Sequence, residues 1–274
     1  LSTPLQRGLW LAYTGVFVAL ILYIRVVKPW LELRRPYEVV EVRPERAESW
    51  TIALRPRGHA GMRFAPGQFA WITLGNSPFS DREHPFSFSG SAEAGDGRLE
   101  FTINERGDFT KSVKHVAPGA TAYIDGPFGS LSADRHPDAA GFALIAGGVG
   151  ITPMMSHLRT FADRAGAGGE TRPLVLFYCS NAWDRVIFRE EIEALAARLP
   201  TLKVVHVLAQ GHEGWTGETG FLTAAIMKKH LPADLSRWEA FICGPTPMMD
   251  AAENALHEIG MPLGNFHSEQ FELV

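Results

Sequence analysis

The chain has 274 residues, of which 46% are hydrophobic and 20% are charged, and its formal net charge is −4. This length and composition predict a globular protein of about two domains and exclude disordered and collagen-like chains. The acidic balance argues against nucleic acid as a partner, because phosphate binding requires a surplus of lysine and arginine. The two cysteines, Cys179 and Cys243, are too few for a disulfide framework, a four-cysteine zinc site or an iron–sulfur cluster.

Residues 1–36 form a segment that is both apolar and basic. Residues 8–27 hold a single charge, Arg25, and as a helix rising about 1.5 Å per residue they match the roughly 30 Å of a bilayer's hydrocarbon core. We therefore predict a transmembrane helix and a basic juxtamembrane linker in 1–36, with the lipid bilayer contacted through residues 8–27. A cleaved signal peptide is disfavoured because no small-residue cleavage site follows the run, and a buried core helix because the run has no polar face.

The charges around this run predict its orientation. Arg7 precedes the run, whereas the other basic residues lie at its end or beyond it: Arg25, Lys28, Arg34 and Arg35. The positive-inside bias then places the remaining residues on the cytoplasmic side of the cell membrane. Because the chain begins with Leu1 rather than methionine, we expect it to be the end of a longer protein.

Residues 37–135 are predicted to form an antiparallel β barrel. Apolar and polar residues alternate at 50–55 and at 99–104, as they do in strands with one buried face. Glycine and proline separate these runs at 66–67, 95–97, 118–119 and 126–127. One short helix is expected near 108–117.

Residues 136–274 follow a different pattern. A wholly apolar run, typical of a strand buried on both faces of a sheet, occurs at 142–146, and further predicted buried runs occur at 174–179, 204–208 and 240–243. Helical stretches separate these runs. This alternation predicts an α/β domain with a doubly wound parallel sheet.

A glycine-rich loop follows the first apolar run, with the sequence Gly147-Gly148-Val149-Gly150-Ile151-Thr152-Pro153. Glycines between a strand and a helix let the backbone approach a pyrophosphate, whose charge meets the free N–H groups at the helix N-terminus. Pro153 suits the first helical turn, where its missing N–H costs nothing. The loop therefore indicates a nucleotide site, although such turns also occur for structural reasons alone.

Three further clusters place polar or reactive groups beside aromatic or glycine residues: His84-Pro85-Phe86-Ser87-Phe88-Ser89, Cys243-Gly244-Pro245 and His267-Ser268-Glu269-Gln270-Phe271. The first can stack a ring on a flat heterocycle and hydrogen-bond its edge. The second ends a buried strand, the edge at which open α/β sheets bind ligands. Each also has a purely structural interpretation: a core strand, a small buried cysteine and a solvated tail.

Taken in order, these motifs resemble the ferredoxin–NADP reductase superfamily, and within it the cytoplasmic dehydrogenase half of ferric reductases and NADPH oxidases. The resemblance covers about 200 residues and rests on 64–69 (FAPGQF), 84–89 (HPFSFS), 107–110 (GDFT), 126–129 (GPFG), 147–154 (GGVGITPM), 187–191 (IFREE), 243–245 (CGP) with 248–249 (MM), and Glu269 with Phe271. It implies FAD in the domain 37–135 and NADPH, or NADH, in the domain 136–274.

The resemblance also implies a role for each motif, and no metal ligands are predicted. It assigns FAD to His84, Pro85, Phe86, Ser87, Ile103, Gly107, Thr110 and Phe271, with Phe271 covering the flavin. It assigns NAD(P)H to Gly147, Gly148, Val149, Gly150, Ile151, Thr152, Pro153, Ser180, Arg185, Cys243, Gly244, Pro245 and Met248. The catalytic residues, near the point where hydride passes from nicotinamide to flavin, are expected to be Ser87, Cys243 and Glu269.

The chain departs from the family pattern in two places. His84 stands where the wider family usually has arginine, which favours the membrane-oxidase branch. Residues 272–274 follow Phe271, whereas the wider family ends on its aromatic residue. Nucleotide choice in the family depends on the segment that here begins at Ser180; Ser180 and Arg185 suit a 2′-phosphate and Asp184 repels one, so we expect NADPH.

These observations predict a flavin-dependent oxidoreductase that takes hydride from NAD(P)H onto FAD and passes single electrons to a membrane haem domain, and from there to ferric iron or dioxygen. Haem b is expected only where an upstream membrane domain exists, because residues 1–36 contain no histidine. Two alternatives stay open: a reductase for a soluble electron-carrier protein, and a flavin-binding regulatory module without turnover. The complete loop at 147–153 argues against the module.

Overall fold

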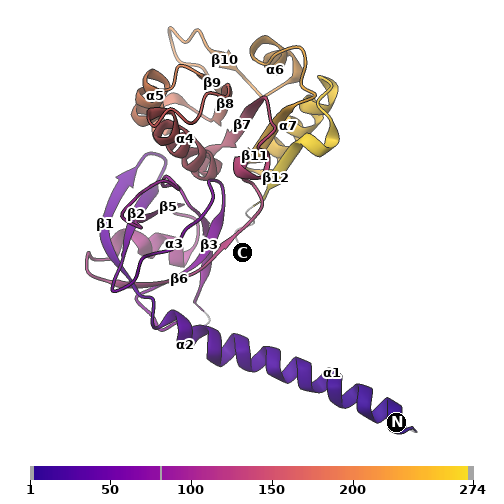
Figure 1. The fold of residues 1–274 in the computed structure, drawn as a ribbon. Coiled ribbons are helices and arrows are strands. Elements are labelled where there is room, and N and C mark those ends of the chain that lie inside the picture. The colour runs from indigo at the N-terminus through magenta and orange to yellow at the C-terminus, as the bar shows by residue number, and fades with distance from the viewer. Residues whose placement is uncertain (1–2, 81, 271–274) are drawn as a thin grey trace.

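The computed structural model describes residues 3–80 and 82–270. Helix α1 (Pro4–Leu22), a π-helical turn (Tyr23–Val27) and α2 (Lys28–Glu32) form one rod that projects away from the rest of the protein (Figure 1). The rod is long and apolar enough to cross a membrane. The described part of the chain buries no side chain of α1, so the interpretation of this run as a core helix is wrong.

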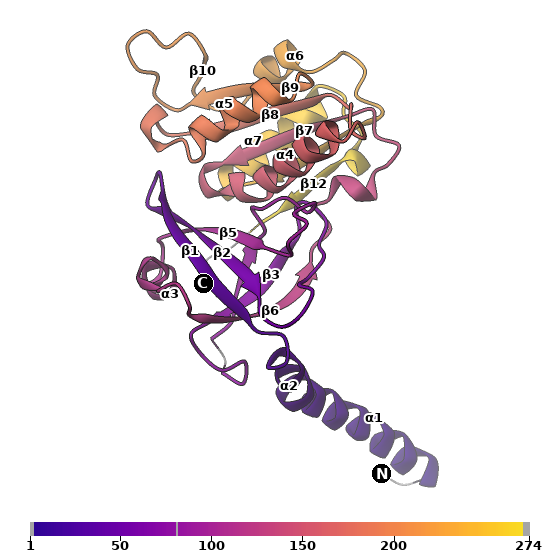
Figure 2. The same ribbon diagram turned by 60° about the vertical axis from the view of Figure 1, so that its left-hand side comes forward.

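The first domain is an antiparallel sheet that curls into a half-barrel with the strand order β4-β3-β6-β1-β2-β5 (Figure 2). One isolated bridge, between Phe88 and Phe101, connects the chain just after β4 to β5, the strand at the other end of this order. The strands are β1 (Tyr37–Glu45), β2 (Ser49–Pro56), β3 (Phe69–Leu74), β4 (His84–Ser87), β5 (Leu99–Asn104) and β6 (Thr121–Phe128). The predicted short helix is α3 (Asp108–Ser112), which continues into a 3-10 turn (Val113–His115).

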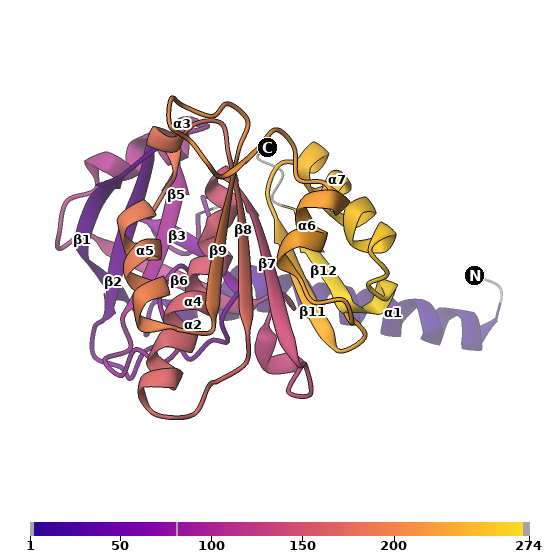
Figure 3. The same cartoon turned by 90° about the horizontal axis from the view of Figure 1, so that it is seen from above.

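The second domain is a parallel sheet with the strand order β10-β9-β8-β7-β11-β12. Its strands are β7 (Gly141–Gly147), β8 (Leu174–Ser180), β9 (Leu202–Leu208), β10 (Glu218–Thr219), β11 (Trp238–Cys243) and β12 (Phe266–Glu269). Its helices are α4 (Ile151–Gly166), α5 (Arg189–Arg198), α6 (Ala224–His230) and α7 (Thr246–Glu258). Helices α4 and α5 cover one face of the sheet and α6 and α7 the other (Figure 3), so the predicted doubly wound sheet is confirmed.

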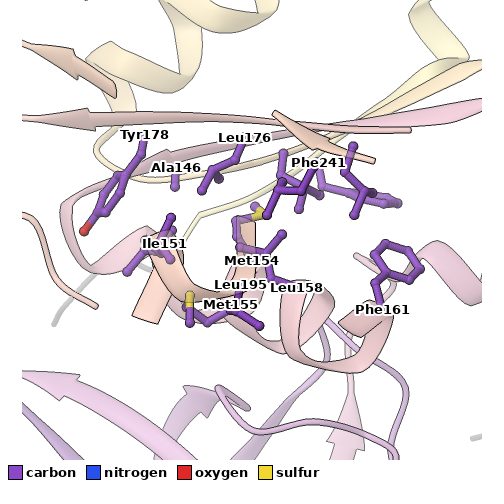
Figure 4. Close-up of a cluster of buried hydrophobic side chains, with 14 of the residues drawn as sticks. Ala146, Ile151, Met154, Met155, Leu158, Phe161, Leu176, Tyr178, Leu195 and Phe241 are labelled. Carbon is purple, nitrogen blue, oxygen red and sulfur yellow. The ribbon is translucent and has the colours of Figure 1, made fainter. Parts of the chain in front are cut away.

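Helix α4 lies between the two domains and contributes to the packing of both. Toward the sheet it presents apolar side chains, among them Met154 and Leu158, which pack beneath Phe241 and its neighbours (Figure 4). Toward the half-barrel its polar side chains bind main-chain carbonyls: Ser156 Oγ donates to Gly90 O at 2.8 Å, and Arg159 Nη1 donates to Ser89 O at 2.7 Å. These two hydrogen bonds, one buried and one half-buried, hold helix α4 of the second domain against the half-barrel.

Candidate functional site

A cavity of about 320 Å³ lies between the half-barrel and the carboxyl ends of β7 and β11. This is the sheet edge at which open α/β folds bind their ligands. The half-barrel contributes Pro85, Phe86, Ser87, Thr102, Ile103, Asn104, Arg106 and Thr110, and the second domain contributes Gly147, Gly148, Val149, Gly150, Thr152, Pro153, Cys243, Gly244 and Pro245. The structure therefore brings together most of the residues that the sequence singled out.

Strand β4 supplies the aromatic part of the half-barrel wall. It pairs with β3 in the register Phe86–Ala70 and Ser87–Phe69. The Phe86 ring lies nearly parallel to the Phe109 ring, with 6.0 Å between centroids. His84 does not line the cavity; its ring stacks on Phe109 at 3.8 Å, and burial lowers its pKa, which keeps the ring neutral at pH 7. An aromatic face beside the Ser87 hydroxyl suits a flat heterocycle.

The turn before α3 holds Gly107 and Thr110 in place. The backbone N–H groups of Arg106 and Gly107 both donate to Thr110 Oγ1 at 2.8 Å, and this hydroxyl donates to Gly107 O at 2.9 Å. The Gly107 N–H and the Thr110 hydroxyl, both of which the resemblance assigns to FAD, are thus hydrogen-bonded to each other here. These hydrogen bonds shape the turn, Thr110 lines the cavity, and Arg106 supplies positive charge beside it.

The glycine loop forms the opposite wall. A side chain at Gly147 would come within 2.9 Å of Pro245 Cδ and Met248 Cε, and one at Gly150 would collide with the Cys243 carbonyl. At Gly148, where φ is +55°, nothing among the described residues lies within 4 Å of a built Cβ. The loop therefore packs tightly against the protein at Gly147 and Gly150 and is free of contacts with the described residues at Gly148. Its backbone is left accessible there and forms an open cradle.

The loop is held from behind by two buried residues. Tyr178 donates its hydroxyl to Gly148 O at 3.1 Å and accepts the Ile187 N–H at 3.1 Å. Ile151 packs fully buried in the core beneath the sheet. Its side chain is therefore turned away from the cavity, and a ligand would meet only its backbone.

Cys243 and Glu269 lie side by side at the ends of β11 and β12, which pair in register. Burial raises the pKa of the Cys243 thiol to about 12, so it is protonated at neutral pH. Burial also raises the pKa of Glu269 to about 7, and its Oε2 has no hydrogen-bond partner among the described residues. Cys243 lines the cavity, whereas Glu269 lies one strand farther out and is not part of the lining. Phe271 lies outside the described residues.

A second cavity of about 230 Å³ shares Gly147, Gly148, Val149 and Pro245 with the first. Its lining adds three residues that the sequence predicted: Ser180, Arg185 and Met248. Asp184 is not in the lining. Arg185 Nη2 lies 3.4 Å from Glu48 Oε2, a long contact at an exposed position.

The sequence interpretation missed residues that link the two cavities. Asn104 and Arg106 line both cavities, and Arg106 Nε donates to Asn104 Oδ1 at 2.7 Å. Their position between a predicted strand and Gly107 was the available signal. The sequence did not indicate that Tyr178 supports the glycine loop, since an aromatic residue inside a buried run is typical of a hydrophobic core.

The residues present fit two dinucleotides that meet. The half-barrel wall offers an aromatic ring and a hydroxyl for a flat ring system, and Arg106 offers positive charge between the two cavities. The opposite wall offers the open cradle at Gly148, the shape that a pyrophosphate requires. FAD on the first wall and NAD(P)H on the second would place their reactive rings near Ser87 and Cys243.

Comparison with known proteins agrees with this division. Residues 36–132 match an FAD-binding domain family, and residues 144–254 match the oxidoreductase NAD-binding domain family. NADH-cytochrome b5 reductase 1 of Neosartorya fischeri is 33% identical over 178 residues, covering 63% of this chain and 56% of that protein. The glycine betaine monooxygenase reductase subunit of Chromohalobacter salexigens is 29% identical over 225 residues, covering 76% of this chain and 56% of that protein. The chain thus spans little more than half the length of these relatives.

Solved structures share the fold. The Amycolatopsis cytochrome P450 reductase GcoB superposes with a TM-score of 0.72 at 22% identity, covering 86% of this chain and 69% of that one. The cytochrome b5 reductase domain of Ulva prolifera nitrate reductase superposes with a TM-score of 0.72 at 20% identity, covering 88% and 98%. The two family matches, together with these folds, show that the chain belongs to the ferredoxin–NADP reductase superfamily as an FAD- and NAD-binding module.

Proposed function

We propose that this protein is an NAD(P)H-dependent FAD oxidoreductase that delivers electrons to a partner at the membrane. The observation that carries the proposal is the cavity in which Phe86 and Ser87 face the Gly147–Gly150 loop and Cys243. Bound FAD supplies the chemistry, because it accepts a two-electron hydride from nicotinamide and releases electrons singly. In the domain division that we propose, 37–135 holds FAD and 136–274 holds NAD(P)H.

The side chains orient the two ligands and exclude water. Phe86 packs against the flavin ring, and Ser87, almost fully buried, offers its hydroxyl to the ring edge. Cys243, protonated and only 2% exposed, forms an uncharged wall beside the nicotinamide. Glu269, next to Cys243 in the sheet but outside the cavity lining, has a pKa raised by burial to about 7, so it can take up or release a proton near neutral pH.

We propose NADPH as the nucleotide. Ser180 and Arg185 line the second cavity, where the 2′-phosphate of NADPH would lie if the nicotinamide is beside Cys243. The contact of Arg185 with Glu48 is long and exposed, so the guanidinium can turn from it toward that phosphate. The relatives named as NADH-cytochrome b5 reductases favour NADH instead, so the two nucleotides are compared directly below.

We propose that the apolar rod is a membrane anchor and that electrons leave on its side of the half-barrel. Lys28 in α2 pairs with Asp125 at 2.5 Å and lies 4.0 Å from Glu83, and Pro29 is buried against the half-barrel. These contacts fix the base of the rod beside the start of β4, whose other end reaches the cavity. A membrane haem partner followed by ferric iron or dioxygen fits this arrangement.

The anchor is tested by flotation with phospholipid vesicles. The parent chain should float with the vesicles in high salt, whereas V16K combined with L20K should stay in solution, since each charge at the centre of a span costs about 3 kcal/mol. Equal flotation of parent and variant would show that the rod does not insert. The matched control places the two lysines in two exposed loops, as A167K with A233K, and should float like the parent.

The electron acceptor is tested by steady-state turnover with NADPH. A ferric chelate, dioxygen, a soluble cytochrome b5 and a b-type membrane haem protein are offered in turn to the FAD-loaded chain in vesicles. Fast reduction of the haem protein, with slow reduction of soluble cytochrome b5, is expected. The reverse order favours the second candidate, a reductase for a soluble carrier, to which the names of the relatives point. FAD binding without turnover with any acceptor favours a regulatory module.

A further inference from the structure

A cluster of two histidines and one glutamate lies on the second domain, outside both cavities. His136 follows the turn that links the domains, Glu239 is near the start of β11, and His267 is in β12. His136 Nδ1 lies 3.3 Å from Glu239 Oε1, and His267 Nε2 lies 2.9 Å from Glu239 Oε2. One donor atom from each of the three residues lies within 4.8 Å of the others. All three side chains are partly buried.

Rigid elements hold these three side chains in place. His267 pairs in register with Phe241, so His267 and Glu239 point to the same face of the sheet. Asn265 Nδ2 donates to Trp238 O at 3.1 Å, which fixes the entry of β12 beside β11. The backbone at His136 is fixed in turn by Arg172, whose Nη1 donates to the His136 carbonyl at 3.2 Å.

The cluster also has an apolar floor. The buried Phe241 ring lies 5.9 Å from the His136 ring and 5.6 Å from the His267 ring, measured between centroids. Apolar surroundings strengthen the attraction between a carboxylate and a cation, because little water competes for either. Glu239 Oε2 is hydrogen-bonded to His267 Nε2, and Glu239 Oε1 lies 3.3 Å from His136 Nδ1. A cation bound between the three side chains would replace these contacts with metal–ligand bonds.

We propose that His136, Glu239 and His267 form a binding site for a divalent transition-metal ion of the zinc class. Two imidazoles and a carboxylate suit Zn²⁺, whereas Ca²⁺ and Mg²⁺ require oxygen ligands throughout. In a tetrahedral zinc site with bonds of about 2.0–2.1 Å, neighbouring ligand atoms lie about 3.3 Å apart. His136 Nδ1 and His267 Nε2 lie 3.3 and 2.9 Å from different oxygens of Glu239, and one ligand atom from each residue lies within 4.8 Å of the others, so small side-chain movements would bring three donors to that spacing. A water would complete the coordination on the open side.

The site is structural rather than part of the electron-transfer cavity. Glu239 precedes Cys243 by four positions along β11, a distance of about 13 Å at 3.3 Å per residue. A metal ion here would join the interdomain turn to β11 and β12. It would hold in place the strand that carries Glu269.

The test uses the full-length chain without a histidine tag, in detergent, stripped with a chelator and then titrated with ZnCl2. Calorimetry and metal analysis should give one zinc per chain, and zinc should raise the unfolding temperature because it binds the folded state. CoCl2 should give the intense visible bands of a four-coordinate cobalt site. H136Q, E239Q and H267Q should each weaken zinc binding by at least about tenfold.

The control is H257Q, which removes an exposed histidine from the end of α7 and should bind zinc like the parent. Circular dichroism identifies any variant that fails to fold. If H267Q does not fold, H136Q still tests the proposal, because it changes a residue in a turn rather than in a strand. If the stripped parent binds no zinc when it is titrated, or if the three variants bind zinc as tightly as H257Q does, the triad is only a hydrogen-bonded cluster. The proposal is then wrong.

Discussion

The two walls of the cavity are built from different parts of the amino-acid chain. The half-barrel wall presents side chains, with the ring of Phe86, the hydroxyl of Ser87 and the charge of Arg106. The wall of the second domain presents backbone, in the Gly147–Gly150 loop and at Gly244. The first wall therefore recognises a ring system by its surface and chemistry, whereas the second recognises a phosphate group by shape.

This difference predicts how each wall responds to substitution. Removing a side chain from the half-barrel wall subtracts one contact and should weaken flavin binding moderately. Adding a side chain to the glycine wall occupies the place of the nucleotide and should block it. The predictions below test this contrast, from the largest expected effect to the smallest.

The largest effect is expected for G148N. Asparagine tolerates the positive φ of this position better than other substitutions, and the new side chain would extend into open space that both cavities share. We expect kcat/KM for NADPH to fall about 100-fold or more, with FAD content unchanged. The control is G168N, at φ +79° in an equally open but remote turn. Parental kinetics in G148N would show that the loop does not hold the nucleotide.

Nucleotide choice is tested by R185A. An arginine that bonds a 2′-phosphate contributes about 1.5 kcal/mol, so KM for NADPH should rise about tenfold while KM for NADH stays within twofold. Steady-state kinetics with both nucleotides measure this directly. R198A, which removes an exposed arginine from the end of α5, is the matched control. Equal changes in the two KM values would remove Arg185 from the proposed phosphate site.

Flavin affinity is tested by F86A. Stacking contributes about 0.5–1.5 kcal/mol beyond the buried area, so its loss alone should raise Kd for FAD about 2–13-fold. Fluorescence titration of the apoprotein measures it. F79A removes an exposed ring from the same domain and should leave Kd unchanged. If both variants bind FAD like the parent, the flavin does not lie on Phe86.

The smallest effect concerns Glu269 and pH. Its folded-state pKa of about 7 lies above the ordinary value, so its contribution to stability is fully present below about pH 4.5 and is lost as the pH rises through 7. E269Q abolishes that loss. Between pH 5 and pH 8, the free energy of unfolding of E269Q should rise relative to that of the parent by on the order of 1 kcal/mol. This value is smaller than the full pKa shift would give, because the carboxyl group is partly exposed.

Thermal unfolding of E269Q and its parent at pH 5 and pH 8 measures this gain. E258Q, at an exposed position at the end of α7, serves as the control and should track the parent at both values. A difference between E269Q and the parent that does not change with pH would show that Glu269 does not titrate in this range.

Most of the fold was predictable because its signals are local. The apolar run 142–146 became β7, and 174–179 became β8, each within two residues. Strand β12 was not predicted, because its polar sequence Phe266–Glu269 becomes a strand only by pairing with β11. The histidine–glutamate cluster was not predicted for the same reason. His267 and Glu239 are 28 positions apart in sequence and come together only in the folded chain.

The site was predictable where a sequence motif specifies a backbone conformation, as at Gly147–Gly150. It was less predictable where a side chain can contact either a ligand or another part of the protein. Thr110 carries a hydroxyl suited to a phosphate, yet the hydroxyl bonds its own turn. Ile151 belongs to the loop motif, yet its side chain belongs to the core. The Thr110 partners lie within its own turn and the Ile151 partners lie in the core, and the sequence pattern alone could not show which contacts these side chains make.

The central claim is that the two walls hold two ligands in contact, and anaerobic reduction of bound FAD tests it most directly. The full-length chain, loaded with FAD and free of oxygen, is mixed with one equivalent of NADPH or NADH while the flavin absorbance is followed. We predict rapid bleaching with the parent chain, faster with NADPH than with NADH, and at least about 100-fold slower bleaching with G148N. Persistent oxidised flavin in the parent chain with both nucleotides would contradict the account and leave a protein that binds FAD without using it.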